Sequence, residues 1–243
     1  MSAIEVRGLT KAFGDLVAVN GLTFSVEEGE LFALLGVNGA GKTTAIRLLT
    51  CLSRADAGEA YLAGHSIADD EQTVKAISNV SPQETAVATR LSVRENLMLM
   101  ARLYGADKEQ AERRADAVME RLGLREIAAR RAGLLSGGWQ RRLSIAMALI
   151  SEPKILFLDE PTLGLDVLAR RELWGILREL KGKITVVLTT HYLEEAEALA
   201  DRIGILSRGK MVACDTAEAL KARAGKDNFE EAFIALATGE VMA

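Results

Sequence analysis

The sequence predicts an α/β fold built around a parallel sheet. Short, largely apolar runs recur along the chain, at Leu31–Leu35, Ile155–Leu158, Ile184–Thr189 and Arg202–Leu206. Such runs are typical of strands that are buried on both faces. Helical segments separate the last three runs, at Leu168–Leu180 and Tyr192–Ala200. This strand–helix–strand order favours a parallel sheet with helices on both of its faces.

The N-terminal part and the middle of the chain differ from this pattern. Ile4–Thr10 and Leu22–Glu27 alternate apolar and polar residues, which predicts strands with one wet face and an N-terminal antiparallel β subdomain. Between Ser92 and Ile150 no run predicts a strand. Ser92 and Glu95 form a capping-box pattern that opens a helix, Lys108–Leu122 is a second amphipathic segment, and a third helix is expected from about Ser136.

We therefore expect one domain over residues 1–243 that contains an inserted α-helical subdomain. The core is expected at residues 1–85 and 151–220, the helical subdomain at about 86–150, and a short tail at 221–243.

The composition indicates a chain with a substantial core and no nucleic-acid partner. Hydrophobic residues make up 49% of the 243 residues, and the net charge is −4 without a basic block. Two cysteines without a Cys-x-x-Cys pair, together with two histidines, argue against a zinc site. The N-terminus lacks the apolar core of a signal peptide, and no apolar run approaches the ~20 residues of a membrane helix. These features predict a soluble protein.

A glycine-rich loop follows the first apolar run and precedes a helix expected over Lys42–Leu52. Residues 36–43 fit the pattern G-x-x-x-x-G-K-[ST]. Backbone N–H groups and the start of the helix can hold phosphates, Lys42 can reach the β- and γ-phosphates, and Thr43 can ligate Mg²⁺. The loop predicts a P-loop NTPase (RecA-like) core that binds ATP and Mg²⁺ through Gly36, Asn38, Gly39, Ala40, Gly41, Lys42, Thr43 and Thr44. No Asn-Lys-x-Asp motif is present to recognise guanine, so ATP is favoured over GTP.

Two acids end the run Ile155–Leu158. Asp159 can hold Mg²⁺, directly or through water. Glu160 projects differently and can orient or deprotonate an attacking water. The alternative is that the two acids merely solvate a loop. The phosphate loop in the same chain disfavours it, because phosphoryl transfer needs a carboxylate that holds the metal.

Ser136-Gly137-Gly138 has two interpretations. Serine is a common residue at a helix start, where its side chain caps the first turn. Exposed N–H groups at a helix start also favour an anion, which would make the segment a second phosphate site.

The ordered set of motifs resembles the nucleotide-binding domain of ABC (ATP-binding cassette) transporters. Ser136–Gln140 resembles the family's signature, Ile155–Glu160 its Walker B strand, and Gly164–Asp166 its D-loop. Gln83 resembles the Q-loop glutamine, His191 the switch histidine, and Phe13 the aromatic residue on which adenine stacks.

The resemblance implies specific roles. Glu160, His191 and Gln83 are expected to be catalytic, with His191 at the γ-phosphate. Thr43, Gln83 and Asp159 are expected at Mg²⁺, and Phe13 and Val19 at the nucleotide. It also implies a head-to-tail dimer with ATP, in which Ser136, Gly137, Gly138 and Asp166 of one chain act on the nucleotide held by the other.

Four positions depart from the family pattern. Trp139 replaces a polar signature residue and can either pack on a neighbouring helix or stack near the nucleotide. Leu163 replaces the D-loop serine, Val37 a common proline, and Phe13 a more common tyrosine.

The resemblance further implies an ATPase subunit that drives export through a separate membrane permease, at the cytoplasmic face of the membrane. The segments His191–Glu197 and Phe229–Gly239 resemble the ABC-2 exporter branch, although Phe229–Gly239 also fits a plain amphipathic terminal helix. Two alternatives are a soluble cassette on a cytosolic scaffold complex and a nucleotide sensor without turnover, the second of which Glu160 disfavours.

Overall fold

A six-stranded sheet forms the centre of the protein in the computed structural model, which describes residues 2–239. Its order is β10-β9-β3-β8-β7-β6. The strands are β3 (Leu31–Leu35), β6 (Ser78–Ser81), β7 (Ile155–Asp159), β8 (Thr185–Thr190), β9 (Arg202–Ser207) and β10 (Lys210–Asp215). Neighbouring strands from β9 to β6 are parallel, and β10 pairs antiparallel with β9. The predicted α/β class with a parallel sheet is confirmed.

Strand β3 is buried on both faces, as its apolar sequence predicts. Leu31, Ala33 and Leu35 belong to one hydrophobic cluster, whereas Phe32 and Leu34 belong to another. Alternate residues of a strand point to opposite faces, so the two clusters lie on the two sides of the sheet. Helices follow several of the parallel strands: α1 (Lys42–Leu49) follows β3, α6 (Val167–Leu180) follows β7 and α7 (Leu193–Leu199) follows β8.

Helix α1 ends earlier than the sequence predicts. We expected it to continue to Leu52, but Thr50 is its C-cap and Cys51 has a φ of 56°. The Leu52 and Ser53 N–H groups instead donate to the Arg47 carbonyl, which closes the helix.

A second, antiparallel sheet is built mainly from the N-terminal residues, in the order β2-β1-β4-β5. Its strands are β1 (Ser2–Phe13), β2 (Leu16–Glu27), β4 (Ala57–Leu62) and β5 (His65–Ser66). The expected antiparallel β subdomain is therefore present. Helix α2 (Glu71–Ile77) lies between β5 and β6 and has no counterpart in the sequence prediction.

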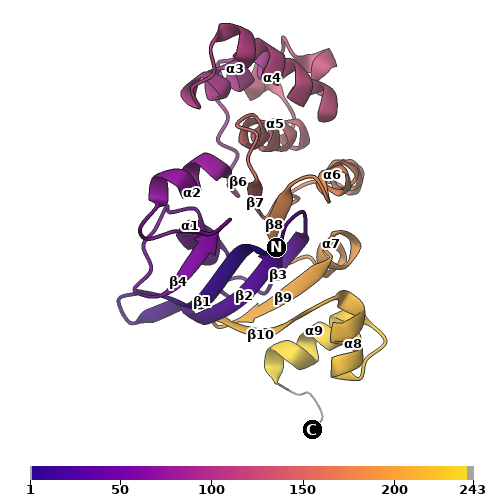
Figure 1. Ribbon diagram of the computed structural model, residues 1–243. Helices are drawn as coiled ribbons and strands as arrows, with labels where there is room; N and C mark the ends of the chain where they lie inside the picture. The colour runs from indigo at the N-terminus through magenta and orange to yellow at the C-terminus, as the bar shows by residue number, and fades with distance from the viewer. Residues whose placement is uncertain (1, 240–243) are drawn as a thin grey trace.

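The middle of the chain is helical. It contains α3 (Val93–Leu103), α4 (Lys108–Arg121), α5 (Gly137–Leu149) and two 3-10 turns, Arg125–Ile127 and Ala132–Leu134. Helices α3 and α4 lie at the top of Figure 1, and α5 lies between them and the ends of β6 and β7. The predicted capping box is formed, because the Ser92 side chain accepts from the Glu95 N–H and the Glu95 carboxylate accepts from the Ser92 N–H. Across residues 92–150, strand-like pairing is limited to a bridge between Ser92 and Arg131.

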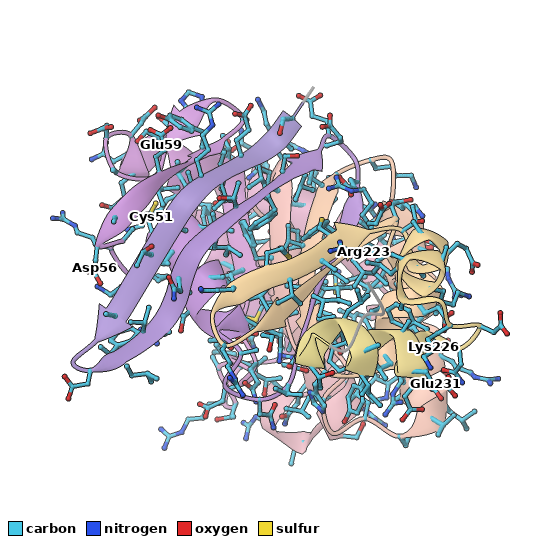
Figure 2. All side chains as sticks on the ribbon, turned by 90° about the horizontal axis from the view of Figure 1, so that it is seen from below. Cys51, Asp56, Glu59, Arg223, Lys226 and Glu231 are labelled. Atoms are coloured by element: carbon cyan, nitrogen blue, oxygen red, sulfur yellow. The ribbon has the colours of Figure 1, made fainter. Side chains whose placement is uncertain are left out.

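The C-terminal helices α8 (Ala217–Ala224) and α9 (Phe229–Thr238) pack beside β9 and β10 (Figure 1). Figure 2 shows Lys226 and Glu231 close together where these two helices meet, and their charged atoms lie 3.9 Å apart. Helix α8 spans position 220, where we expected the core to give way to a tail, and Phe229 and Leu236 of α9 join a core cluster. Within residues 2–239, no helix combines the length and the apolar character that crossing a bilayer requires.

Candidate active site

A cleft of about 720 Å³ lies at the carboxyl ends of the parallel strands. Ligands commonly bind at this edge of an α/β sheet. The lining residues come from the β1–β2 turn, the glycine-rich loop and the ends of β6, β7, β8 and β9. They are Phe13, Leu16, Val17, Ala18, Asn38, Gly39, Ala40, Gly41, Lys42, Thr43, Thr44, Gln83, Glu160, Leu163, His191 and Arg208.

The glycine-rich loop leaves the first turn of α1 open for a ligand. Gly41 is the N-cap, so no side chain caps the helix. The first N–H groups of a helix lack intrahelical acceptors and are a ready site for phosphate. Glycine is required at position 41, because its φ is +104° and an added Cβ would lie 2.3 Å from the Ala18 carbonyl oxygen.

Lys42 is held in place inside the loop. Its ammonium donates to the Gly36 carbonyl oxygen at 2.7 Å and lies 3.2 Å from Glu160 Oε1. Both side chains are only 6% exposed. The lysine therefore pairs with an acid that follows β7, far from it in the sequence.

Asp159 stands at the end of β7 among hydroxyl groups. Thr43 Oγ1 donates to Asp159 Oδ1 at 3.2 Å, and Thr189 Oγ1 donates to the same oxygen at 2.5 Å. Carboxylate and hydroxyl oxygens are the ligands that Mg²⁺ prefers. The donor set formed by Thr43 and Asp159 thus fits a hard divalent cation beside the phosphate loop.

Glu160 follows directly and adopts a left-handed backbone conformation, with φ at 49°. This conformation is uncommon for a residue other than glycine and often marks a functional turn. The Glu160 N–H donates to the carbonyl and to the hydroxyl of Thr189, both at 3.1 Å. Glu160 Oε2 lies 2.8 Å from His191 Nδ1, so one carboxylate contacts both Lys42 and His191.

A second buried acid follows His191 in the sequence. Glu195 in α7 is completely buried and accepts a hydrogen bond from Trp174 Nε1 at 3.2 Å. Burial raises the pKa of the Glu195 carboxyl, and the charge of Glu160 raises it further, while the hydrogen bond from Trp174 opposes the rise.

Phe13 and Val19, both in the antiparallel sheet, are predicted to contact the nucleotide, but only Phe13 lines the cleft. The Phe13 ring is 55% exposed and lines the cleft, where a stacking face is available. Val19 does not line the cleft. Its side chain is fully buried in the core, because alternate residues of β2 point to opposite faces, and Ala18 lines the cleft instead.

The signature and most of the D-loop lie outside this cleft, and only Leu163, at the position of the D-loop serine, lines it. Ser136 occupies the N-cap position of α5, but its hydroxyl makes no capping hydrogen bond. Gly137 lines a neighbouring cleft of about 380 Å³ together with Gln83 and Gly164. Asp166 caps α6 by accepting from the Leu168 and Ala169 N–H groups, each at 2.9 Å.

Trp139 packs within its own chain. The Arg142 guanidinium lies 4.6 Å from the centre of the Trp139 ring, and Arg142 is also paired with Glu172 of α6. The Arg142 contact lies within α5 itself, and only the Arg142–Glu172 pair reaches α6, so the two interpretations of Trp139 stay predictions.

Several residues at the site were not predicted from the sequence, and Thr189 and Arg208 are the two polar ones. Thr189 touches both Asp159 and the Glu160 N–H, and Arg208 lines the cleft from the turn after β9. The available sequence signal for Thr189 is a hydroxyl residue at the end of the apolar run Ile184–Thr189. Arg208 carries no such signal.

The sequence of the chain is similar to a known protein family and to several known proteins. Residues 19–163 match the family described as ABC transporter. The chain is 43% identical to the daunorubicin resistance ATP-binding protein DrrA3 of Streptomyces coeruleorubidus over 94% of this chain and 73% of that protein. It is 41% identical to the Nod factor export ATP-binding protein I of Rhizobium sp. (strain N33), over 90% of this chain and 72% of the relative.

Solved structures agree with these relatives. An ATP-binding subunit of an ABC transporter is 30% identical with a TM-score of 0.85, covering 96% of this chain and 99% of its own. A dimeric ATP-binding cassette bound to ADP and phosphate is 26% identical with a TM-score of 0.78, covering 88% and 98% of the two chains.

Proposed function

The chain belongs to the ABC transporter family, and from this premise we propose that it is the ATP-hydrolysing subunit of an exporter and works with a separate membrane permease. The observation that carries the proposal is the convergence of the phosphate loop with Glu160 and His191 in one cleft. The two relatives named above are a drug-resistance protein and an export protein, which supports export as the direction.

In the proposed site, the α1 N-terminus and Lys42 hold the nucleotide phosphates. Thr43 and Asp159 provide the oxygen ligands for Mg²⁺, with Gln83 nearby at the cleft wall. When bound, Mg²⁺ neutralises negative charge that develops on the phosphates. Phe13 offers its exposed ring to adenine.

Glu160 is the proposed base for the attacking water. Its Oε1 faces Lys42 and its Oε2 faces His191, so two polar groups fix the orientation of the carboxylate. A Lys42 that moves to the phosphates would release Glu160 Oε1 to accept a proton from water. His191 remains placed to hold Glu160 and to contact the γ-phosphate.

The complete site is proposed to need two chains. The nucleotide cleft of the same chain is not lined by Ser136, Gly137, Gly138 or Asp166. The Ser136 hydroxyl makes no capping hydrogen bond to α5. A second copy arranged head to tail would bring these residues to the open side of the nucleotide. The dimeric cassette among the solved relatives supports this arrangement.

The test of hydrolysis is ATP turnover by purified wild-type protein and by Glu160→Gln. We expect kcat to fall about 10²- to 10⁴-fold in the variant, the usual contribution of a general base, with ATP binding retained. Equal turnover by the two proteins would overturn the assignment of Glu160.

Glu160→Gln should also form an ATP-dependent dimer in size-exclusion chromatography, because it binds ATP without consuming it.

The test of the transport role is co-expression with a neighbouring permease. We expect the chain to bind the cytoplasmic face of the permease. It should therefore sediment with membranes only when the permease is present. A full-activity complex that stays in the soluble fraction would favour the alternative, a cassette that acts on a cytosolic scaffold.

A further inference from the structure

Arg141 is a buried arginine that the proposed mechanism leaves without a role. It belongs to α5, the helix that starts after Ser136, and only 3% of it is exposed. Burying a guanidinium is unfavourable unless every N–H group finds an acceptor. Burial lowers the pKa of Arg141, whereas the charges of Asp159, Glu195 and Glu160 raise it.

All five N–H groups of Arg141 are matched to backbone carbonyl oxygens. Nε donates to Pro161 at 2.8 Å. Nη1 donates to Pro82 at 2.5 Å and to Gln83 at 3.1 Å. Nη2 donates to Asp159 at 2.8 Å and also to Glu160. A guanidinium carries five donors in a rigid fork, so this arrangement uses its full capacity.

The acceptors belong to two segments that the sequence separates widely. Pro82 and Gln83 follow β6, whereas Asp159, Glu160 and Pro161 end or follow β7. β6 and β7 are neighbours in the sheet, so the two segments leave it side by side. Where the strands end, their carbonyl oxygens lose sheet partners, and the guanidinium supplies donors to both segments at once.

We propose that Arg141 is a positioning residue for ATP hydrolysis, which holds the backbone of Gln83 and the turn of Glu160 at fixed places relative to α5. The inference rests on the hydrolytic function proposed above. Arg141 does not line the nucleotide cleft, so it acts through these two segments rather than on the substrate. Because α5 starts at the signature, a movement of that helix would move both segments together.

Two substitutions test the role at constant or near-constant size. Arg141→Lys keeps the charge but offers three donors, and Arg141→Gln removes the charge and offers two. Neither can supply donors to all five carbonyl oxygens. The control is Arg178→Lys, because Arg178 of α6 also donates to a carbonyl, that of Ala198 at 3.3 Å, away from the cleft.

We expect kcat for ATP to fall about 10²-fold in both Arg141 variants, as expected for a displacement of about 1 Å at a reacting group. KM for ATP should stay within about twofold, because the phosphate loop is untouched. In the Glu160→Gln background, Arg141→Lys should cause little further loss, since both changes act through the same carboxylate. Arg178→Lys should match wild type.

Three results would overturn the inference. The first is an unchanged kcat in folded Arg141 variants. The second is full additivity with Glu160→Gln. The third is a failure of both Arg141 variants to fold while Arg178→Lys folds, which would make the role purely stabilising. Wild-type protein that does not hydrolyse ATP would instead contradict the proposed function itself, so the two failures are distinguishable.

Discussion

Lys42 Nζ lies 3.2 Å from Glu160 Oε1, and each of the two side chains is only 6% exposed. The lysine that we propose binds phosphate and the glutamate that we propose acts as the base therefore form a buried ion pair. Phosphates that enter the loop compete with Glu160 for the same ammonium group.

Lys42→Met should abolish ATP binding and also destabilise the nucleotide-free fold. The substitution leaves Glu160 buried without its cation, and breaking a buried pair in this way costs about 3–5 kcal/mol. Urea denaturation measures the change. The double variant Lys42→Met/Glu160→Gln should recover most of the loss, because no unpaired charge remains. A single variant as stable as wild type would show that the pair adds nothing.

Glu195→Gln should change how stability depends on pH. The pKa of Glu195 is raised in the folded chain, mainly by burial. Wild-type stability should therefore fall as pH rises from the ordinary glutamate pKa towards the raised value, because the folded state holds the proton more tightly. The glutamine variant carries no titrating group at position 195, so its free energy of unfolding should not show this fall with rising pH.

Urea denaturation between pH 4 and pH 8 tests this difference. Glu194→Gln is the matched control, because Glu194 is the exposed neighbour in the same helix. Parallel pH curves for wild type and Glu195→Gln would contradict the raised pKa.

Gly41→Ala should destabilise the chain more than Gly39→Ala. Both glycines have a positive φ, but an added Cβ at Gly41 meets the Ala18 carbonyl oxygen at 2.3 Å, whereas nothing lies within 4 Å of one at Gly39. Backbone strain alone costs about 1–3 kcal/mol, and the clash adds to it only at Gly41. Thermal unfolding without nucleotide compares the two, and equal losses would argue against the clash.

Trp139→Ala should lower the free energy of unfolding modestly. The variant loses the Arg142–Trp139 contact, and a cation–π pair near the surface contributes about 0.5–1 kcal/mol. Arg142→Ala should show a similar loss, and the double variant should be less destabilised than the sum. Additive losses would indicate that the ring and the guanidinium do not interact.

The sequence predicts the central strands and the phosphate loop well, because their signals are local. Leu31–Leu35 is apolar on both faces and is the observed strand β3. β4 escaped detection because the first half of Ala57–Leu62 is exposed and offers no apolar run. The sequence predicts an end of α1 that is too far along the chain, because the left-handed conformation of Cys51 has no sequence signal.

The contacts inside the site depend on tertiary structure and could not be predicted. The pairing of Lys42 with Glu160 and that of Thr189 with Asp159 join residues that meet only through the order of the strands. The same holds for Arg141, whose acceptors are backbone atoms without any residue-type pattern. The roles assigned to Ser136 and Asp166 across a dimer remain predictions.

The strand that carries the phosphate loop has consequences for how the chain is made. β3 pairs with β8 and β9, so both of its strand neighbours come from residues after 184. A growing chain therefore exposes the loop on an unpaired strand until most of its length has left the ribosome. ATP can stabilise only the state that binds it. Nucleotide should thus stabilise the chain most once β8 has been inserted beside β3.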